Sequence, residues 1–404
     1  MNHFKIRKTP ENALRNGESS AAIQARPGRS TGTRAPGRAA LRSRLKALFA
    51  HRDHGTVQRS PHGRDDQAGG ALLAAGFLAT AMLAFALFAH GCSPNNTSPD
   101  NTRAQTMNGF DVSNSAVPLD EIHRGGPPRD GIPALTDPEF IGAGGAHGLR
   151  DDDRVLGVFR NGVAKAYPLG IMNYHEVVND LFGAEPIAVT YCPLCFTGIA
   201  FQAGQPDGSR RTFGVSGLLY NSDVLLYDRE TESLWSQIAA RAIAGPRRGE
   251  TLAMVPLANT TWEAWHAEHP DTRVLSRDTD YARNYDRDPY AAYAEDEALM
   301  FPVRFRMQAM HPKTPVLGVR IGDHARAYPF AEFPETGRHR VEDTLGGEVI
   351  TLDVDADAQT GRVFDSRGEE LTSLIAFWFA WFAFHPETER YTGDPPAVPI
   401  EDGV

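Results

Sequence analysis

The chain has 404 residues, of which 41% are hydrophobic and 23% charged, a composition typical of a folded protein with a sizeable core. It excludes wholesale disorder and a protein that crosses the membrane many times. Residues 1–70 carry 14 Lys and Arg against five Asp and Glu, and residues 71–92 carry no charge. The net charge is +9 for residues 1–70 and −10 for the whole chain, so residues 93–404 carry a net charge of −19. A body this acidic repels phosphate, so no nucleic-acid partner is expected.

The first predicted feature along the chain is an export signal. Residues 71–92, ALLAAGFLATAMLAFALFAHGC, form an apolar run behind an arginine-rich arm, the order found in such signals. The run ends in Gly91-Cys92, which resembles the lipobox of bacterial lipoproteins, where the cysteine is acylated after cleavage. About 20 apolar residues also suffice to span a bilayer, so an uncleaved membrane helix is the alternative. Both interpretations predict an extracytoplasmic, membrane-anchored protein, and the first predicts lipidation of Cys92.

The remaining domain boundaries follow from composition. Residues 1–70 lack apolar periodicity, and we interpret them as a disordered arm or as the product of a start codon assigned too early. Residues 93–109 form a polar linker, and the globular domain is expected over 110–404.

Inside the globular domain, short β-prone runs recur between glycines and prolines, with few long amphipathic patterns. We therefore predict an α+β fold that is rich in β-structure and has a few short helices. Helices are expected at residues 168–182 and 260–268. The apolar run 374–384 is too short for a membrane span and is expected to be a buried helix or strand.

The domain also contains an internal repeat. Residues 155–169 align without a gap to residues 316–330, and the match resumes with His175 placed opposite His339. A spacing of about 160 residues is too long for a solenoid and predicts a duplicated β-rich supersecondary unit over 154–202 and 315–365. The first copy continues into a Cys-Pro-Leu-Cys motif, whereas the second contains no cysteine. This asymmetry points to a function for the cysteines beyond packing.

The motif Cys192–Cys195 lies between two predicted strands, as in the metal knuckles of rubredoxins and zinc ribbons, and not at the start of a long helix as in thioredoxin-like proteins. A knuckle supplies two thiolates, a tetrahedral metal needs further ligands, and no second knuckle is present. We expect His175 to complete a site for zinc, copper or iron. Glu176 and Tyr191 are candidates for residues that orient the ligands.

Other interpretations of the cysteines remain open. In an oxidising compartment they could carry out thiol–disulfide exchange, or form a structural disulfide in a non-catalytic binding module with an unidentified protein or small-molecule partner. No phosphate-binding loop, nucleotide fingerprint or complete serine-hydrolase motif is present, so the sequence leaves open whether the protein is an enzyme.

Several motifs resemble those of the Domain of Unknown Function 3179 family. They are Asn173-Tyr-His-Glu176, Thr190-Tyr-Cys-Pro-Leu-Cys195, Phe213-Gly-Val-Ser-Gly217, Asp228–Gln237, Asp288-Pro-Tyr290, and Phe377–Trp381 with His385-Pro386. The resemblance spans about residues 150–391 and implies that His175, Cys192 and Cys195 belong to one recurring pattern. It implies no reaction, since the family has no established activity. Phe196 stands where many metal knuckles have glycine.

Overall fold

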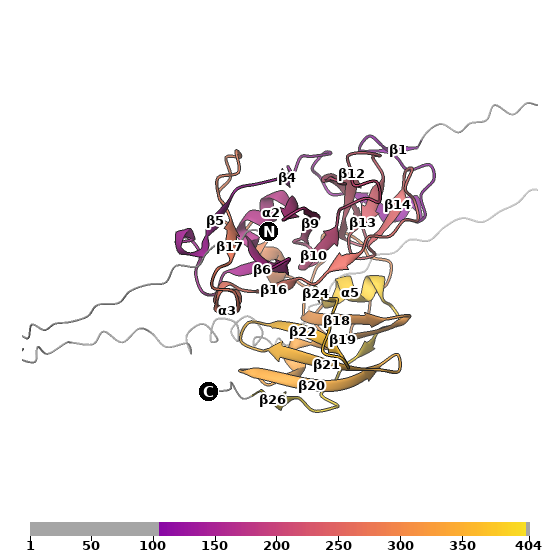
Figure 1. The fold of residues 1–404 in the computed structure, drawn as a ribbon. Helices are drawn as coiled ribbons and strands as arrows, with labels where there is room; N and C mark the ends of the chain where they lie inside the picture. Colours follow the sequence, from indigo (N-terminus) through magenta and orange to yellow (C-terminus); the bar gives the residue numbers. More distant parts are fainter. Residues whose placement is uncertain (1–104, 401–404) are drawn as a thin grey trace, which may run out of the picture. The chain divides into compact units, whose positions relative to one another are not determined.

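Mostly antiparallel β-sheets make up the bulk of the structure, a computed structural model that describes residues 105–400 (Figure 1). The chain divides into two units, Met1–Met82 and Leu83–Val404, and all described residues belong to the second. The predictions for residues 1–70, for the apolar run 71–92 and for Cys92 lie outside the described residues. Among the described helices, none has the length and apolar character to cross a membrane.

The predicted β-rich architecture with a few short helices is confirmed. The described part contains α2 (Leu169–His175), α3 (Trp262–Glu268), α4 (Ala291–Glu295) and α5 (Trp378–Phe384), and the 3-10 helices η1 (Leu119–Glu121), η2 (Ala143–Gly145) and η3 (Phe330–Glu332). Strands β1 (Thr106–Met107) and β2 (Phe110–Asp111) form a small ribbon apart from the larger sheets.

Three of the larger sheets lie in the first half, residues 105–275. In spatial order, sheet I contains β15 (Met254–Val255), β10 (Thr197–Gln202), β9 (Glu185–Cys192), β8 (Val177–Phe182) and β4 (Leu135–Thr136). Sheet II contains β14 (Arg241–Ala244), β13 (Leu234–Ser236), β12 (Asp223–Asp228), β11 (Phe213–Tyr220) and β3 (Ile122–Arg124). Sheet III contains β16 (Ala258–Thr261), β6 (Arg154–Arg160), β7 (Val163–Pro168), β17 (Arg273–Leu275) and β5 (Phe140–Gly142).

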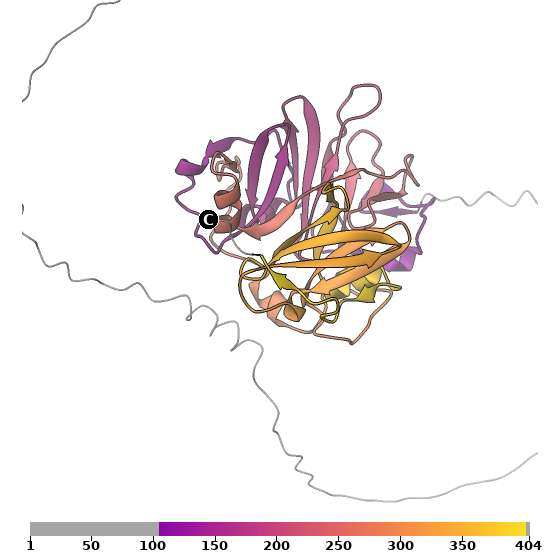
Figure 2. The ribbon, with the colours of Figure 1, turned by 60° about the horizontal axis from the view of Figure 1, so that its bottom comes forward.

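The second half, residues 315–400, forms two sheets, whose orange and yellow strands lie in front in Figure 2. Sheet IV contains β24 (Ser373–Phe377), β18 (Pro315–Ile321), β19 (His324–Pro329) and β25 (Glu389–Arg390). Sheet V contains β23 (Glu370–Leu371), β22 (Thr360–Asp365), β21 (Glu348–Asp355), β20 (Arg338–Leu345) and β26 (Val398–Pro399). Residues 276–314, the connecting segment, join the halves and include α4.

The expected helix at residues 168–182 begins as predicted but ends at His175. Glu176 takes a left-handed conformation with φ of 56°, which stops the helix, and β8 follows at once. Helix α3 begins after Thr261, whose hydroxyl accepts a hydrogen bond from the Ala264 amide at 3.3 Å. The apolar run 374–384 forms both elements considered for it, most of strand β24 followed by buried helix α5.

Two sheets of the first half resemble the two sheets of the second in strand order, whereas sheet II has no counterpart in residues 315–400. Sheets III and IV each have a central hairpin, β6–β7 in sheet III and β18–β19 in sheet IV. One strand, β16 or β24, lies beside the first strand of the hairpin, and a short strand, β17 or β25, pairs in parallel with the second. In register, Gly157 faces Ala166 and Gly318 faces Ala327. Sheets I and V both contain a three-strand meander, β8–β9–β10 and β20–β21–β22.

In the second part of the internal repeat, the residues that correspond in the structure differ by one position from those paired in the sequence alignment. Lys165 Nζ and Tyr167 Oη donate to the Asp180 carboxylate at 2.8 and 2.6 Å, and Arg326 and Tyr328 bind Asp343 in the same way. Asp180 therefore corresponds to Asp343, whereas the sequence alignment paired Asn179 with it. Because a one-residue slip reverses the faces of a strand, His175 and His339 are not equivalent: the first ends α2 and the second lies within β20.

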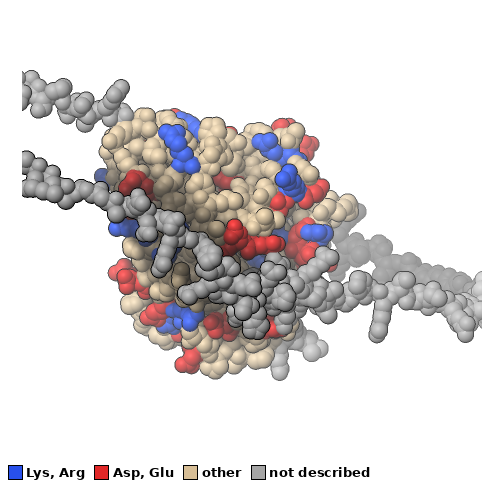
Figure 3. Space-filling model, turned by 180° about the vertical axis from the view of Figure 1, so that it is seen from behind, with Lys and Arg blue, Asp and Glu red and all other residues tan. Residues whose placement is uncertain are grey.

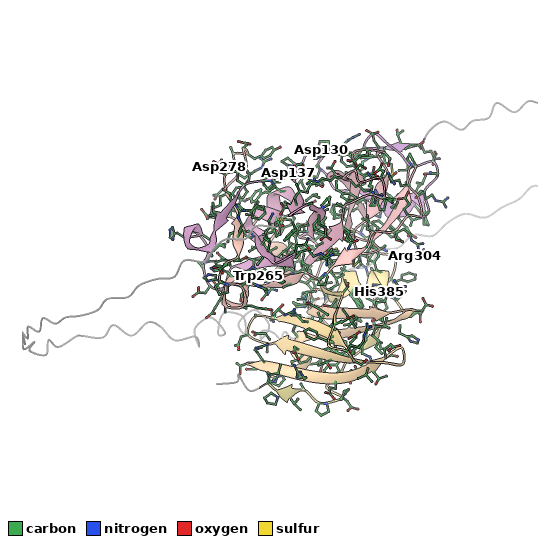
Figure 4. The ribbon with its side chains drawn as sticks, viewed as in Figure 1. Asp130, Asp137, Trp265, Asp278, Arg304 and His385 are labelled. Carbon is green, nitrogen blue, oxygen red and sulfur yellow. The ribbon has the colours of Figure 1, made fainter. Side chains whose placement is uncertain are left out.

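The correspondence extends to helices α3 and α5. The Trp265 indole packs on Gly157 and the Trp381 indole on Gly318, so closely that an added Cβ would lie 2.2 or 2.3 Å from the ring. Each indole N–H donates to a threonine seven residues later, at 2.9 Å in α3 and 2.8 Å in α5. A histidine lies against each indole as well, and Figure 4 labels Trp265 beside α3 and His385 at the end of α5.

Charged side chains of both signs are interspersed on the face seen in Figure 3. Some form ion pairs on the surface of the domain, such as Arg340 with Asp353 and Arg362 with Glu268, each at 2.7 Å. Exposed pairs of this kind contribute at most about 1 kcal/mol each to folding. The buried sheet faces, and not these pairs, hold the domain together.

Candidate metal centre

The Cys-Pro-Leu-Cys motif forms the tight loop between β9 and β10, as the sequence predicts. Cys192 ends β9 and pairs with Thr197 at the start of β10. The Cys195 amide donates to the Cys192 carbonyl at 3.2 Å, which closes a turn. Both cysteines are free thiols and both are buried. The arrangement is a strand, a turn with two sulfurs, and a strand.

Phe196 completes this loop in the left-handed conformation, with φ of +60°. This is the backbone conformation that favours the glycine found here in many knuckles, so the departure lies in residue type and not in loop shape. Packing offsets the strain: the Phe196 ring stacks on Phe377 with centroids 5.2 Å apart, and the Arg154 guanidinium lies 5.1 Å from its centroid. In sheet V, Gln359 takes the same conformation with φ of 45°, in a loop of equal length without cysteines.

Asp223 joins the two cysteines. One ligand atom from each of Cys192, Cys195 and Asp223 lies within 4.8 Å of the other two, and this is the group with metal-binding geometry found among the described residues. Asp223 begins β12 in sheet II and is fully buried. The carbonyl of the preceding residue, Ser222, accepts weak hydrogen bonds from both thiols, at 3.9 Å and 3.4 Å.

Only one oxygen of the Asp223 carboxylate has a hydrogen-bond partner among the described residues. Its Oδ2 accepts a hydrogen bond from the Ile238 amide at 3.0 Å, whereas its buried Oδ1 has no hydrogen-bond partner among the described residues. An unpartnered buried carboxylate oxygen costs about 1–3 kcal/mol or more. An oxygen of this kind beside two sulfurs has the chemistry of a vacant metal ligand.

Burial changes the acidity of every group at this centre. It raises the pKa of Asp223 to about 7 and, together with the Asp223 charge, the pKa of Glu176 to about 8. It also raises the pKa of both thiols, so the cysteines are protonated at neutral pH. Negative charge therefore accumulates here only if a cation compensates it, and a metal would displace protons on binding.

His175 does not join this group. Its Nδ1 lies 2.7 Å from the Pro133 carbonyl, which can only accept, so Nδ1 carries the proton and donates. Its Nε2, 2.7 Å from the Tyr285 hydroxyl, then accepts from Tyr285, and that hydroxyl also contacts Thr279 at 2.5 Å. Burial lowers the pKa of His175, which keeps the ring neutral. Both nitrogens are thus engaged: Nδ1 fixes the end of α2 to Pro133, and Nε2 fixes it to Tyr285.

The two residues expected to surround the site lie next to it. The Glu176 carbonyl accepts a hydrogen bond from the Tyr191 amide at 2.8 Å, which fixes Glu176 beside the strand that ends in Cys192. Both side chains are buried. Burial raises the pKa of Tyr191, and Cys192 contributes to the shift, so its phenol stays protonated.

The connecting segment adds two tyrosines. Tyr293 belongs to the same hydrophobic cluster as Cys192 and Cys195, and Tyr290 packs against that cluster. The Tyr293 hydroxyl is buried without a hydrogen-bond partner among the described residues, and the Lys313 ammonium lies 3.6 Å from the centroid of its ring. The Asn173 amide holds the segment through Asp288 Oδ1 at 3.1 Å.

Comparison with known proteins adds one finding. A family model described as protein of unknown function (DUF3179) matches residues 129–372, a range that includes the two cysteines, Asp223 and Tyr293. No curated protein and no solved structure gives a match. Because the family model covers more than half of the chain, this protein belongs to the DUF3179 family.

Proposed function

We propose that this protein binds one transition-metal ion, zinc, copper or iron, through Cys192, Cys195 and Asp223. The observation that carries the proposal is the unpartnered, fully buried Oδ1 of Asp223 within 4.8 Å of two sulfurs. Two thiolates and one carboxylate suit these borderline and soft metals better than magnesium or calcium, which prefer oxygen ligands alone.

Metal analysis tests the proposal directly. Wild-type protein purified under reducing conditions should take up close to one equivalent of zinc or another transition metal in equilibrium dialysis. The two remaining interpretations are outcomes of the same experiment. A metal-free protein whose cysteines cycle between thiols and a disulfide at a defined potential would replace the proposal with redox chemistry. A metal-free protein with a permanent disulfide would replace it with a binding module.

The titration of Asp223 gives a prediction for the metal-free protein. A carboxyl whose pKa rises from 3.8 to about 7 on folding binds more protons in the folded state between these values. The free energy of unfolding therefore falls as pH rises through this window, by an amount on the order of a few kcal/mol. Chemical denaturation in EDTA at pH 5 and pH 8 should show a smaller loss for Asp223→Asn than for wild type. Equal losses in the two proteins would contradict the prediction. With zinc added, the free energy of unfolding should instead rise with pH, because the metal displaces the protons on binding.

We also propose that the two halves arose from one duplicated unit. The support is the shared strand order, the equivalent Asp180 and Asp343 contacts, and the two Trp–Gly contacts. The metal centre uses parts outside that correspondence: sheet II supplies Asp223, and the connecting segment brings Tyr293. The scaffold would then be duplicated and the site confined to one half.

We propose further that the protein is extracytoplasmic and anchored to the membrane by lipid on Cys92. The support is the uncharged run that ends in Gly91-Cys92. Expressed in a bacterium that processes lipoproteins, the wild type should incorporate a labelled fatty acid and Cys92→Ala should not. Absence of label, with residues 71–92 retained in the mature protein, would instead establish an uncleaved anchor.

A further inference from the structure

We infer that the metal keeps one coordination position open to a small exogenous ligand, a water or small anion, and that Tyr293 and Glu176 line this position. The inference rests on the proposed metal site. It assigns to that site the arrangement of a reactive metal centre in place of a purely structural one.

The first step is the ligand count. Structural zinc sites are closed by four protein ligands, whereas catalytic sites have three and leave the fourth position to water or substrate. The group here offers three ligands, and no other His, Cys, Asp or Glu of the described residues belongs to it. His175 already uses both ring nitrogens in hydrogen bonds to Pro133 and Tyr285.

The second step is the unpartnered hydroxyl of Tyr293. It is a buried donor without an acceptor among the described residues, in the cluster that contains both cysteines. The Ser222 hydroxyl donates to the Phe301 carbonyl at 3.2 Å, so the connecting segment also contacts the turn that leads into Asp223. Because buried hydroxyls normally have a hydrogen-bond partner, a ligand on the metal would supply the acceptor that Tyr293 lacks.

The third step is Glu176, whose carboxyl group receives no hydrogen bond from the described residues. Glu176 is buried and lies close enough to Asp223 and Cys192 to interact electrostatically with both. A carboxyl oxygen of Glu176 can accept a hydrogen bond from a water molecule on the metal, whereas azide has no proton to donate to it. Tyr293 and Glu176 thus offer one donor and one acceptor to a metal-bound water.

Cobalt(II) provides the test, because its visible spectrum reports on both the ligands and the coordination number. Wild-type protein loaded with one equivalent should show a thiolate-to-cobalt charge-transfer band, and titration with azide should shift the d–d bands to saturation at one azide per metal. Tyr293→Phe should keep the charge-transfer band and weaken azide binding about 5- to 10-fold through loss of one hydrogen bond. Glu176→Leu should keep the band and strengthen azide binding, because it removes the acceptor that holds the competing water molecule. Tyr281→Phe, on the exposed part of the same segment, is the matched control and should change neither.

The outcomes separate the two proposals. Absence of the charge-transfer band would refute the metal site itself. A normal band with d–d bands that azide does not shift would leave the metal site intact and refute the open position. Azide binding that neither Tyr293→Phe nor Glu176→Leu alters would refute the assignment of these two residues to its lining.

Discussion

Asp223→Asn is expected to weaken metal binding by roughly 10²–10³-fold, and Cys192→Ser and Cys195→Ser by at least as much. Structural metal sites with four ligands bind with about 10–16 kcal/mol, so each ligand accounts for about 2.5–4 kcal/mol. Asparagine keeps the shape of Asp223 and its contact with the Ile238 amide but removes the charge that the metal would neutralise. The measurement is a competition titration with a chromophoric chelator.

The matched control for this prediction lies on the same strand. Asp228, at the other end of β12, is also fully buried, but its carboxylate accepts hydrogen bonds from Trp235 and Thr231. Asp228→Asn should lower the stability of the fold and leave metal affinity within about 3-fold of wild type. If Asp223→Asn bound metal as tightly as Asp228→Asn does, the carboxylate would not be a ligand. Because the change removes a buried charge, metal-free Asp223→Asn should be no less stable than metal-free wild type at pH 8.

The second large effect is expected in the scaffold. Gly157→Ala and Gly318→Ala each place a methyl group where the Trp265 or Trp381 indole already lies, at 2.2 or 2.3 Å. Overpacking of this kind typically costs about 1–3 kcal/mol and more where backbone must move, and both indoles are fixed by hydrogen bonds to threonines. Denaturant unfolding should show losses at the top of this range or above for both variants.

Gly142→Ala is the control for the glycine variants, because its φ is −68° and nothing lies within 4 Å of an added Cβ. It should change stability by less than about 0.5 kcal/mol. Replacing Trp381 with Phe should restore part of the stability lost in Gly318→Ala, since the smaller ring leaves room for the methyl group. If the double variant lost as much as the two single variants combined, the clash would not be the cause.

The sequence predicted the cysteine loop and the repeated hairpins because both are local patterns. A strand, a Cys-x-x-Cys turn and a strand lie within about 20 residues, and 15 aligned positions define the first hairpin of each half. The pattern Trp-x-x-Trp-x-x-x-His-x-x-Thr also occurs twice in the sequence, beginning at Trp262 and at Trp378. It marks α3 and α5 as equivalent helices.

Asp223 was not predictable in the same way. It lies 28 residues after Cys195, at the start of a strand in a different sheet, and its spacing from the cysteines follows no known motif. His175 was chosen as the third ligand because it lies near the cysteines in sequence. Its neutral ring instead bonds Pro133 and Tyr285, contacts that arise from tertiary structure and leave no trace in local periodicity. The one-residue error at His339 has the same origin, since apolar alternation alone does not determine strand register.

X-ray absorption spectroscopy of the zinc-loaded wild-type protein tests the central claim most directly. The account predicts two sulfur atoms at about 2.3 Å and oxygen ligands at about 2.0 Å, without the multiple-scattering features of imidazole. A first shell without sulfur, or one that requires a histidine, would show that Cys192, Cys195 and Asp223 are not the ligand set.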